Sequence, residues 1–134
     1  MTNAGRATAR CTICVRALAL LGACMLAMAA YGRGPSTESM ENVSLGELPA
    51  EAREVYDRIL AGGPFRYERD GVVFGNREHL LPSRSRGYYH EYTVPTPAAH
   101  NRGARRIICG GPKVSPEACF YTDDHYRSFR RIRA

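Results

Sequence analysis

The spacing of hydrophobic residues changes from a helical to a strand-like period at Gly62 and Gly63. Before these glycines, residues 48–63 place apolar side chains at the i, i+3, i+4 spacing of a helix with one buried face. After them the spacing becomes two, the alternation of half-buried strands. One helix followed by short strands predicts an α+β fold, in which a single N-terminal helix packs on a short antiparallel β-sheet. The strand candidates, separated by Pro and Gly clusters, are residues 70–74, 87–94, 105–111, 119–122 and 129–133.

The predicted helix has signals at both ends. Pro49 suits the first helical position, and the two glycines can end the helix in a left-handed cap. Its expected buried face consists of Ala52, Val55, Tyr56, Ile59 and Leu60.

The first 30 residues have the pattern of an export signal. They contain three arginines and no acid, and residues 17–30 form a hydrophobic run with small residues at its end. This run is short for a transmembrane helix, which needs about 20 apolar residues, so a retained N-terminal anchor is the second alternative. Lipidation at Cys24 ranks lower, because apolar residues continue past this cysteine. We therefore expect a secreted, extracellular protein.

Length and composition predict one folded domain behind this signal. A chain of 134 residues has room for one modest core. Residues 31–46 are rich in Gly, Pro, Ser, Thr and Glu, which indicates a flexible mature N-terminus. The expected organisation is a signal peptide over 1–30, the flexible segment over 31–46 and the domain over 47–134.

Charge is unevenly distributed along the chain. Residues 38–70 carry eight acids and four arginines, whereas residues 71–134 carry eleven basic residues and five acids. A basic C-terminal half favours an anionic partner such as nucleic acid. A solvated basic surface is the alternative, since 18 arginines against one lysine also fits a compositional bias.

Two of the five cysteines, Cys109 and Cys119, lie outside the predicted signal. In an oxidising compartment they could form a disulfide. For Cys109, inside the strand candidate RRIICGG, the sequence favours a buried free thiol. Cys11 and Cys14 have a CxxC-like spacing without a second pair, so no zinc site is predicted.

Four parts of the chain carry side chains that can take part in catalysis or ligand binding. They are FGNRE (74–78), Glu91, RGARR (102–106) and DHY (124–126). Glu91 stands out, because it interrupts the aromatic and β-branched strand candidate GYYHEYTV. Each segment alone has an ordinary explanation: a solvent-facing strand carboxylate, a solvated basic turn, a surface histidine. Their order and separations are more informative.

Together these segments resemble the small secreted guanyl-specific ribonucleases of bacteria, the family of barnase and the streptomycete enzymes. The resemblance runs from Leu48 to Ile132, and the streptomycete branch is more similar. The matching blocks are LPAEA, DGVVFGNRE, GYYHEYTV, RRIICGG and YTDDHYRSF. The resemblance implies a microbial ribonuclease fold and cleavage of single-stranded RNA after guanosine, without metal or cofactor.

For catalysis, the resemblance implies that Glu91 is the general base and His125 the general acid. Arg102 and Arg106 match the pair that binds the phosphate, for which a planar guanidinium is well suited. These arginines would also favour the ionised form of Glu91. The product would be a 2′,3′-cyclic phosphate, which is then hydrolysed to the 3′-phosphate.

For guanine selection, the resemblance implies that Glu78 accepts hydrogen bonds from N1–H and the 2-amino group. The loop of Gly75, Asn76 and Arg77 would donate backbone N–H groups to O6 and N7. Phe74 and Tyr126 would stack on the base, as recognition of single-stranded RNA usually requires. If no ligand bound there, Phe74 and Tyr126 would be core residues and Glu78 a turn acid.

Two departures from the family concern the second half of the chain. The segment 110–118 is longer than in streptomycete relatives, which bears on the placement of His125. The terminal cysteine of those relatives is absent, and Ser44 stands where its partner would fall.

The resemblance also implies partners, and it leaves competing functions to be considered. We expect a monomer that acts on single-stranded RNA, and an acidic intracellular inhibitor similar to barstar. The competing functions are a basic RNA-binding domain without activity and an interbacterial toxin with the same chemistry.

Overall fold

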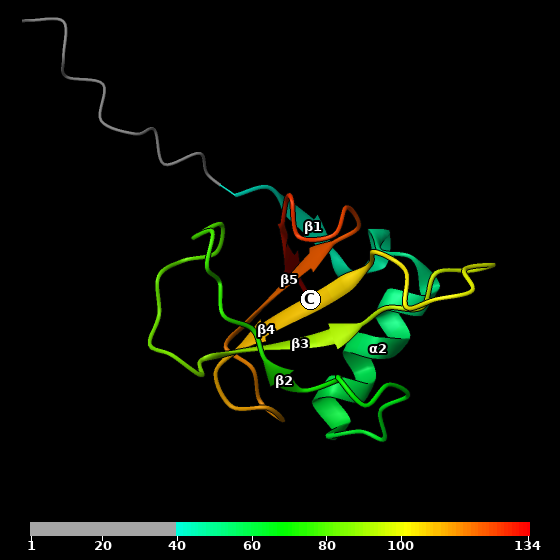
Figure 1. The fold of residues 1–134 in the computed structure, drawn as a ribbon, viewed down its shortest axis with the longest axis horizontal. Helices are drawn as coiled ribbons and strands as arrows, with labels where there is room; N and C mark the ends of the chain where they lie inside the picture. The colour runs from blue at the N-terminus through cyan, green and yellow to red at the C-terminus, as the bar shows by residue number, and fades with distance from the viewer. Residues whose placement is uncertain (1–39) are drawn as a thin grey trace, which may run out of the picture. The chain divides into compact units, whose positions relative to one another are not determined.

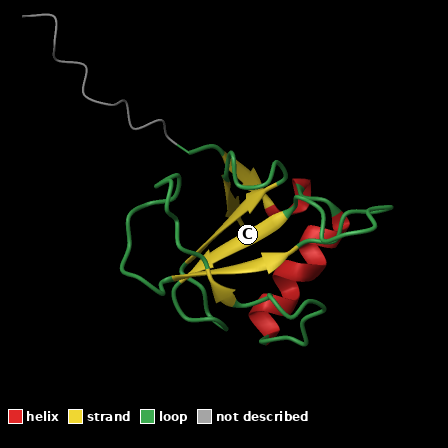
Figure 2. Ribbon diagram, viewed as in Figure 1, coloured by secondary structure: helices red, strands yellow, loops and turns green. Residues whose placement is uncertain are grey.

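The computed structural model describes residues 40–134, so the predictions for residues 1–39 lie outside the described part. These residues form one α-helix, a short 3-10 helix and a six-stranded sheet, which confirms the predicted α+β fold (Figures 1 and 2). The elements are β1 (Asn42–Ser44), the 3-10 helix η1 (Leu45–Glu47), α2 (Ala50–Ala61), β2 (Val72–Val73), β3 (Tyr89–Thr93), β4 (Arg106–Gly110), β5 (Ala118–Thr122) and β6 (Arg130–Arg133). None of the helices in this part is long and apolar enough to cross a membrane.

The sheet is mixed, where an antiparallel one was predicted. Its strand order is β1-β6-β5-β4-β3-β2, and every neighbouring pair is antiparallel except β1 with β6. Strand β1 lies in the segment that was predicted to be flexible, so the prediction was wrong for residues 42–46. Val43 is buried in β1, and the following turn is capped by Ser44 and Glu47. Such a short strand, with a single apolar residue, exists because β6 pairs with it.

The helix α2 begins one residue later than predicted, with Pro49 as its N-cap. Gly62 ends it at a φ of 78°, in the predicted left-handed cap. The predicted buried face was too wide, because Leu60 is 44% exposed. The residues of α2 that are fully buried are Ala52, Val55 and Ile59.

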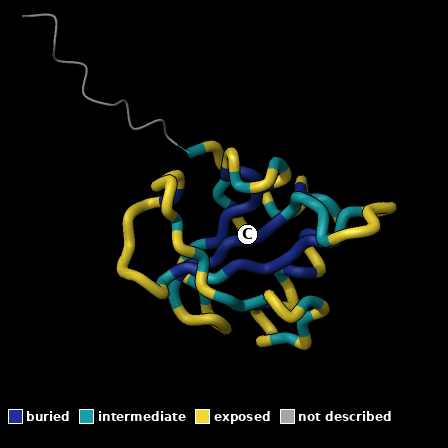
Figure 3. Tube along the Cα trace, viewed as in Figure 1, coloured by how far each residue is buried: buried dark blue, intermediate teal, exposed yellow. Residues whose placement is uncertain are grey.

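The core lies on both faces of the sheet. Most residues of the central strands β3, β4 and β5 are buried (Figure 3). Side chains alternate along β4, so that Ile107 and Cys109 pack on the side of α2 while Ile108 packs on the opposite side. The same alternation places Tyr92 with the helix and Tyr89 with Ile108. Glu91, two residues after Tyr89, therefore faces away from α2.

Cys109 and Cys119 form a disulfide that joins β4 and β5. The two residues are directly opposite in the strand register, so the favoured interpretation of Cys109 as a free thiol was wrong. The sequence alone leaves this register undetermined, because it does not define the length of the hairpin between the strands. A backbone hydrogen bond closes the hairpin: the N–H of Glu117 donates to the carbonyl of Gly110 at 2.8 Å.

Candidate active site

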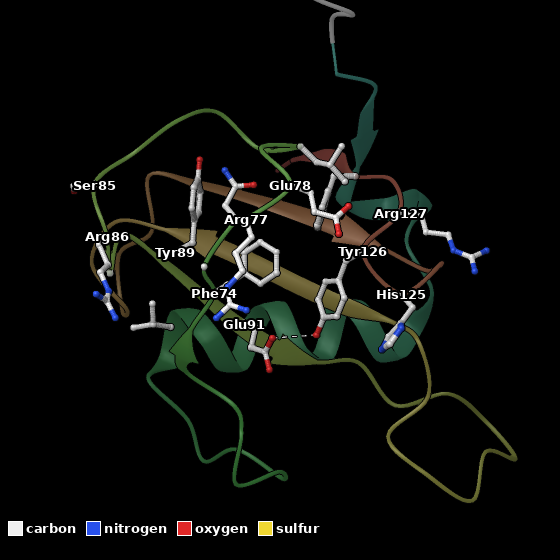
Figure 4. A pocket seen from close by; sticks show the side chains of 16 residues that line it. Phe74, Arg77, Glu78, Ser85, Arg86, Tyr89, Glu91, His125, Tyr126 and Arg127 are labelled. Atoms are coloured by element: carbon white, nitrogen blue, oxygen red, sulfur yellow. Dashed lines mark hydrogen bonds between the residues drawn. The ribbon is translucent and has the colours of Figure 1, made fainter.

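A cavity of about 840 Å³ opens on the face of the sheet away from α2 (Figure 4). Its walls come from β3, from the segment after β2, from residues 85–87 and from the turn between β5 and β6. It brings together eight of the ten residues predicted from the sequence: Phe74, Gly75, Asn76, Arg77, Glu78, Glu91, His125 and Tyr126. A second cavity of about 600 Å³ lies beside Arg102 and shares His125 with the first. None of residues 110–118 lines either cavity, so the longer hairpin stays clear of the site.

Glu91 is the buried carboxylate of this cavity, only 7% exposed. Its Oε2 accepts a hydrogen bond of 3.0 Å from the Tyr126 hydroxyl. Its Oε1 lies 3.7 Å from Nη2 of Arg102 and 3.6 Å from Nε of Arg69. A buried carboxylate requires such partners, since leaving it unpaired would cost several kcal/mol. The structure thus places cations beside Glu91, but one of the two, Arg69, was not predicted.

Arg102 and Arg106 are held differently. Arg102 donates to Oγ1 of the buried Thr93 from Nε and Nη2, at 3.1 and 2.6 Å. Arg106 is only 3% exposed, and its Nη1 donates to the carbonyls of Arg102, Gly103 and Arg105. Its Nε donates to the Tyr126 hydroxyl at 3.1 Å, so Arg106 reaches Glu91 through that hydroxyl. Within residues 40–134 its Nη2 makes no hydrogen bond, which leaves this nitrogen for a ligand.

Gly103 allows the loop between the two arginines to turn. Its φ is 63°, and a Cβ at this position would collide with Oγ1 of Thr96. A residue with a side chain would therefore displace the loop that carries Arg102 and the carbonyls that hold Arg106.

Tyr126 lies between the acid and the buried arginine. Burial raises the pKa of its hydroxyl, and the negative charge of Glu91 adds to this increase against the opposing effect of Arg106. The hydroxyl therefore stays protonated and donates to Glu91 while it accepts from Arg106. Its ring faces that of Phe74, with centroids 5.4 Å apart and planes at 26°. Stacked bases lie about 3.4 Å apart in nucleic acids, so a base cannot enter between these rings unless one of them moves.

His125 and Tyr126 occupy a strained turn between β5 and β6. Both residues have left-handed backbone conformations, with φ values of 60° and 68°. Asp124 holds this turn, because its Oδ1 accepts from the Thr122 hydroxyl and from the backbone N–H of Arg127 and Ser128. Its Oδ2 accepts from the Ser128 hydroxyl at 2.6 Å. The His125 side chain remains exposed at the rim of both cavities.

The segment 74–78 is organised by Asn76. Its side-chain amide donates to the carbonyl of Leu81 at 2.9 Å and accepts from the N–H of Leu81 at 3.1 Å. Asn76 has a φ of 43°, which turns the backbone there. Among the described residues, no hydrogen bond uses the backbone N–H groups of Asn76, Arg77 or Glu78. These donors and the exposed carboxylate of Glu78 are thus available at one end of the cavity.

The sequence profile of the ribonuclease family matches residues 33–133. The chain belongs to this ribonuclease family. It is 53% identical over 97 residues to guanyl-specific ribonuclease Sa3 of Kitasatospora aureofaciens, covering 72% of this chain and 67% of that protein. It is 51% identical over 94 residues to guanyl-specific ribonuclease St of Saccharopolyspora erythraea, covering 70% of this chain and 89% of that protein.

Solved structures of a ribonuclease share the fold as well. Ribonuclease Sa2 in complexes with mononucleotides matches with a TM-score of 0.67 and 41% identity, over 72% of this chain and 96% of that one. Its complex with guanosine-2′-cyclophosphate matches with a TM-score of 0.65 and the same identity, over 71% of this chain and 97% of that one. The resemblance inferred from the sequence is therefore confirmed.

Three residues of this ribonuclease site were missed in the sequence prediction. Arg69 lies in the segment before β2, whose position beside Glu91 depends on the β2–β3 pairing. Thr93 and Asp124 act through other side chains. Nothing in the local pattern distinguishes Thr93 from an ordinary strand residue. Asp124 belongs to the DHY segment that was singled out from the sequence, but only His125 and Tyr126 of that segment were given a role.

Proposed function

We propose that this ribonuclease cleaves single-stranded RNA on the 3′ side of guanosine, through a 2′,3′-cyclic phosphate. The names of its relatives and the guanosine cyclophosphate bound to ribonuclease Sa2 support this substrate and this intermediate. The observation that carries the proposal is the buried carboxylate of Glu91, which shares one cavity with His125 and is contacted by Arg102 and Tyr126.

In the first step, Glu91 removes the proton of the guanosine 2′-hydroxyl. The 2′-oxygen attacks the adjacent phosphorus, and the bond from phosphorus to the 5′-oxygen of the next nucleotide breaks. His125 protonates that oxygen as it leaves. Because the nucleophile belongs to the same nucleotide, the protein need not bring it to the phosphate, which removes a large entropic cost.

In the second step the roles of the two groups are exchanged. His125 accepts a proton from water, which attacks the cyclic ester, and Glu91 returns its proton to the departing 2′-oxygen. The product is a 3′-phosphate, and Glu91 and His125 recover their starting protonation states.

Arg102 and Arg106 supply the positive charge for the phosphate. Negative charge builds up on the phosphoryl oxygens in the transition state, and donors already held in place stabilise it without reorganisation. The burial of Arg106 and its three carbonyl partners support such a fixed donor. Arg102 can leave Glu91 for the phosphate, because its hydroxyl partner Thr93 holds only part of the guanidinium.

Guanine is selected at the other end of the cavity. Glu78 accepts hydrogen bonds from N1–H and the 2-amino group, and the backbone N–H groups of residues 75–77 donate to O6 and N7. Phe74 and Tyr126 provide the aromatic contact. Adenine would turn an acceptor toward Glu78, and the unpaired carboxylate makes that complex unfavourable.

The test is cleavage of oligoribonucleotides that contain a single guanosine, in the presence of a chelator, with products identified by mass spectrometry. We expect one cut on the 3′ side of guanosine, with a cyclic phosphate that later becomes a 3′-phosphate. Cleavage at other bases with equal efficiency would contradict the guanine assignment. RNA that is bound but never cut would instead support the inactive RNA-binding domain.

We also propose that the protein is secreted, from the signal pattern of residues 1–30. Ribonuclease activity in the medium of the producing cells, with an N-terminus beyond residue 30, is the expected result. Activity that remains with the membrane fraction would support a retained anchor instead.

A secreted ribonuclease endangers the cell that makes it, so we propose an acidic intracellular inhibitor of a monomeric enzyme. The exposed arginines beside the cavity, such as Arg77 and Arg127, would attract such a protein. Cytosol of the producing cells should inhibit the purified enzyme through a protein component, and less so at high salt. Inhibition that survives protease treatment of the cytosol would argue against it.

A further inference from the structure

Arg69 approaches Glu91 from a part of the chain in which the sequence predicted no site residue. It lies in the segment between α2 and β2, and its Nε is 3.6 Å from Oε1 of Glu91. Arg102, from the loop between β3 and β4, contacts the same oxygen atom at 3.7 Å. One carboxylate oxygen therefore has guanidinium groups from two separate parts of the chain beside it.

The backbone that carries Arg69 is fixed to the strand that carries Glu91. The Asp70 carboxylate accepts from the N–H of Thr93 at 2.7 Å and from the N–H of Tyr67 at 3.1 Å. The N–H of Gly71 donates to the Glu91 carbonyl at 2.8 Å. These bonds hold Asp70 and Gly71 against β3. Because Arg69 directly precedes them, the position of the Arg69 Cα relative to Glu91 is well defined.

Thr93 connects the two cations. Its backbone N–H bonds Asp70, beside Arg69, and its hydroxyl accepts from the guanidinium of Arg102. The same strand residue thus positions both arginines around the carboxylate.

Neutralising Glu91 does not require Arg69. Arg102 and the Tyr126 hydroxyl already contact the two carboxylate oxygens. The Arg69 side chain is 65% exposed, and an ion pair with such a side chain contributes little stability. A guanidinium has five donors, and within residues 40–134 Arg69 has no acidic partner other than Glu91. Most of its hydrogen-bonding capacity is therefore free, beside the carboxylate of Glu91.

We propose that Arg69 is a third cationic catalytic residue, which binds the scissile phosphate together with Arg102 and Arg106. This inference rests on the proposed function. Two guanidinium groups that both reach one oxygen of Glu91 can both reach the phosphoryl group beside which Glu91 must act. Arg69 then stabilises the charge that develops on a non-bridging oxygen as the 2′-oxygen attacks.

The test compares Arg69→Gln with the control Arg66→Gln, on the dinucleotide guanylyl-3′,5′-cytidine. Arg66 belongs to the same segment and contacts the ring of Tyr67 but no acid, so both variants lose one charge. The dinucleotide has a single phosphate, so an effect on its cleavage concerns the scissile group. We expect kcat/KM to fall about 10- to 100-fold in Arg69→Gln, and to change less than about twofold in Arg66→Gln. Arg69→Lys should recover part of the loss, because lysine retains the charge but not the planar fork.

A binding measurement tests the contact between Arg69 and the phosphate without catalysis. By calorimetry, Arg69→Gln should weaken the binding of guanosine 3′-phosphate and leave that of guanosine unchanged. Equal kinetics of the two variants, or a loss seen with long RNA but absent with the dinucleotide, would overturn the role of Arg69. A wild-type enzyme that does not cleave the dinucleotide would instead contradict the proposed function itself.

Discussion

At the scale of single residues, the central feature is a carboxylate buried in an aromatic strand. Glu91 is tolerated there because Tyr126 and Arg102 contact its two oxygens, while the exposed Arg69 lies beside one of them. The sequence identifies Glu91 by its contrast with its neighbours, and the resemblance identifies Arg102 as a partner. It does not identify Arg69, because that contact depends on where β2 pairs with β3.

Replacing Glu91 by Gln removes the proposed base but keeps the size of the side chain. We expect kcat/KM on guanylyl-3′,5′-cytidine to fall by at least about 100-fold, while the dissociation constant for guanosine 3′-phosphate changes little. Glu117→Gln is the matched control, since Glu117 bonds the Tyr88 hydroxyl outside the cavity. Turnover retained in Glu91→Gln would remove the assignment of the base.

Replacing Glu78 by Gln should weaken the preference for guanine. The amide nitrogen of glutamine would meet the donors of guanine, so kcat/KM for guanylyl-3′,5′-cytidine should fall about 10- to 100-fold. Cleavage of adenylyl-3′,5′-cytidine should change much less. Steady-state kinetics on the two dinucleotides give the ratio, and an equal decrease on both would show that Glu78 does not select the base.

At the scale of elements, the sequence predicts best what depends on local patterns. The helix α2 and the strands β2 to β6 follow from periodicity and from Gly and Pro. Strand β1 and the Cys109–Cys119 pairing do not, because each depends on register between separate segments. Leu60 was misplaced for a similar reason: the width of a buried helix face is decided by the sheet against which it packs.

The turn that carries His125 depends on Asp124. Burial raises the pKa of this carboxyl, but hydrogen bonds from Ser128, Thr122 and the N–H of Arg127 outweigh that effect and lower it from 3.8 to about 2. Because the pKa of Asp124 is lower in the folded state, its ionised carboxylate stabilises the fold at pH values above the unfolded pKa of 3.8. This stabilisation is lost as the pH falls toward 2.

Asp124→Asn should therefore be less stable than the wild type at pH 6, and the difference should shrink as the pH falls below about 4. Urea denaturation at a series of pH values measures this difference. Because the turn also positions His125, kcat/KM should decrease about tenfold or more. A difference in stability that stays constant down to pH 2.5 would contradict this role of Asp124.

The disulfide belongs to the β4–β5 hairpin. It closes a short loop, with a sequence separation of 10 residues, for which chain-entropy arguments give about 2–3 kcal/mol of stabilisation. We expect the double variant Cys109→Ala/Cys119→Ala to unfold at lower urea concentration and to retain activity at low temperature. A reducing agent should shift the wild type in the same direction and leave the double variant unaffected. A wild-type midpoint that does not respond to reduction would show that the bond adds no stability.

At the scale of the whole molecule, the larger part of the hydrophobic core and the candidate active site lie on different faces of the sheet. The helix and the larger core cluster lie on one side of the sheet, and the proposed catalytic groups Glu91 and His125 lie on the other (Figures 1 and 4). Acids gather in residues 38–70 and basic residues in 71–134, which supply most of the catalytic side. A basic site of this kind suits a substrate made of phosphates.

The central claim is that the 2′-hydroxyl of guanosine is the nucleophile that cuts the chain. The most direct measurement uses two otherwise identical oligonucleotides, with a single guanosine or a single 2′-deoxyguanosine at the same position. The account predicts one cut after guanosine, with a 2′,3′-cyclic phosphate end, and an intact strand when that oxygen is missing. Equal cleavage of both oligonucleotides would contradict it.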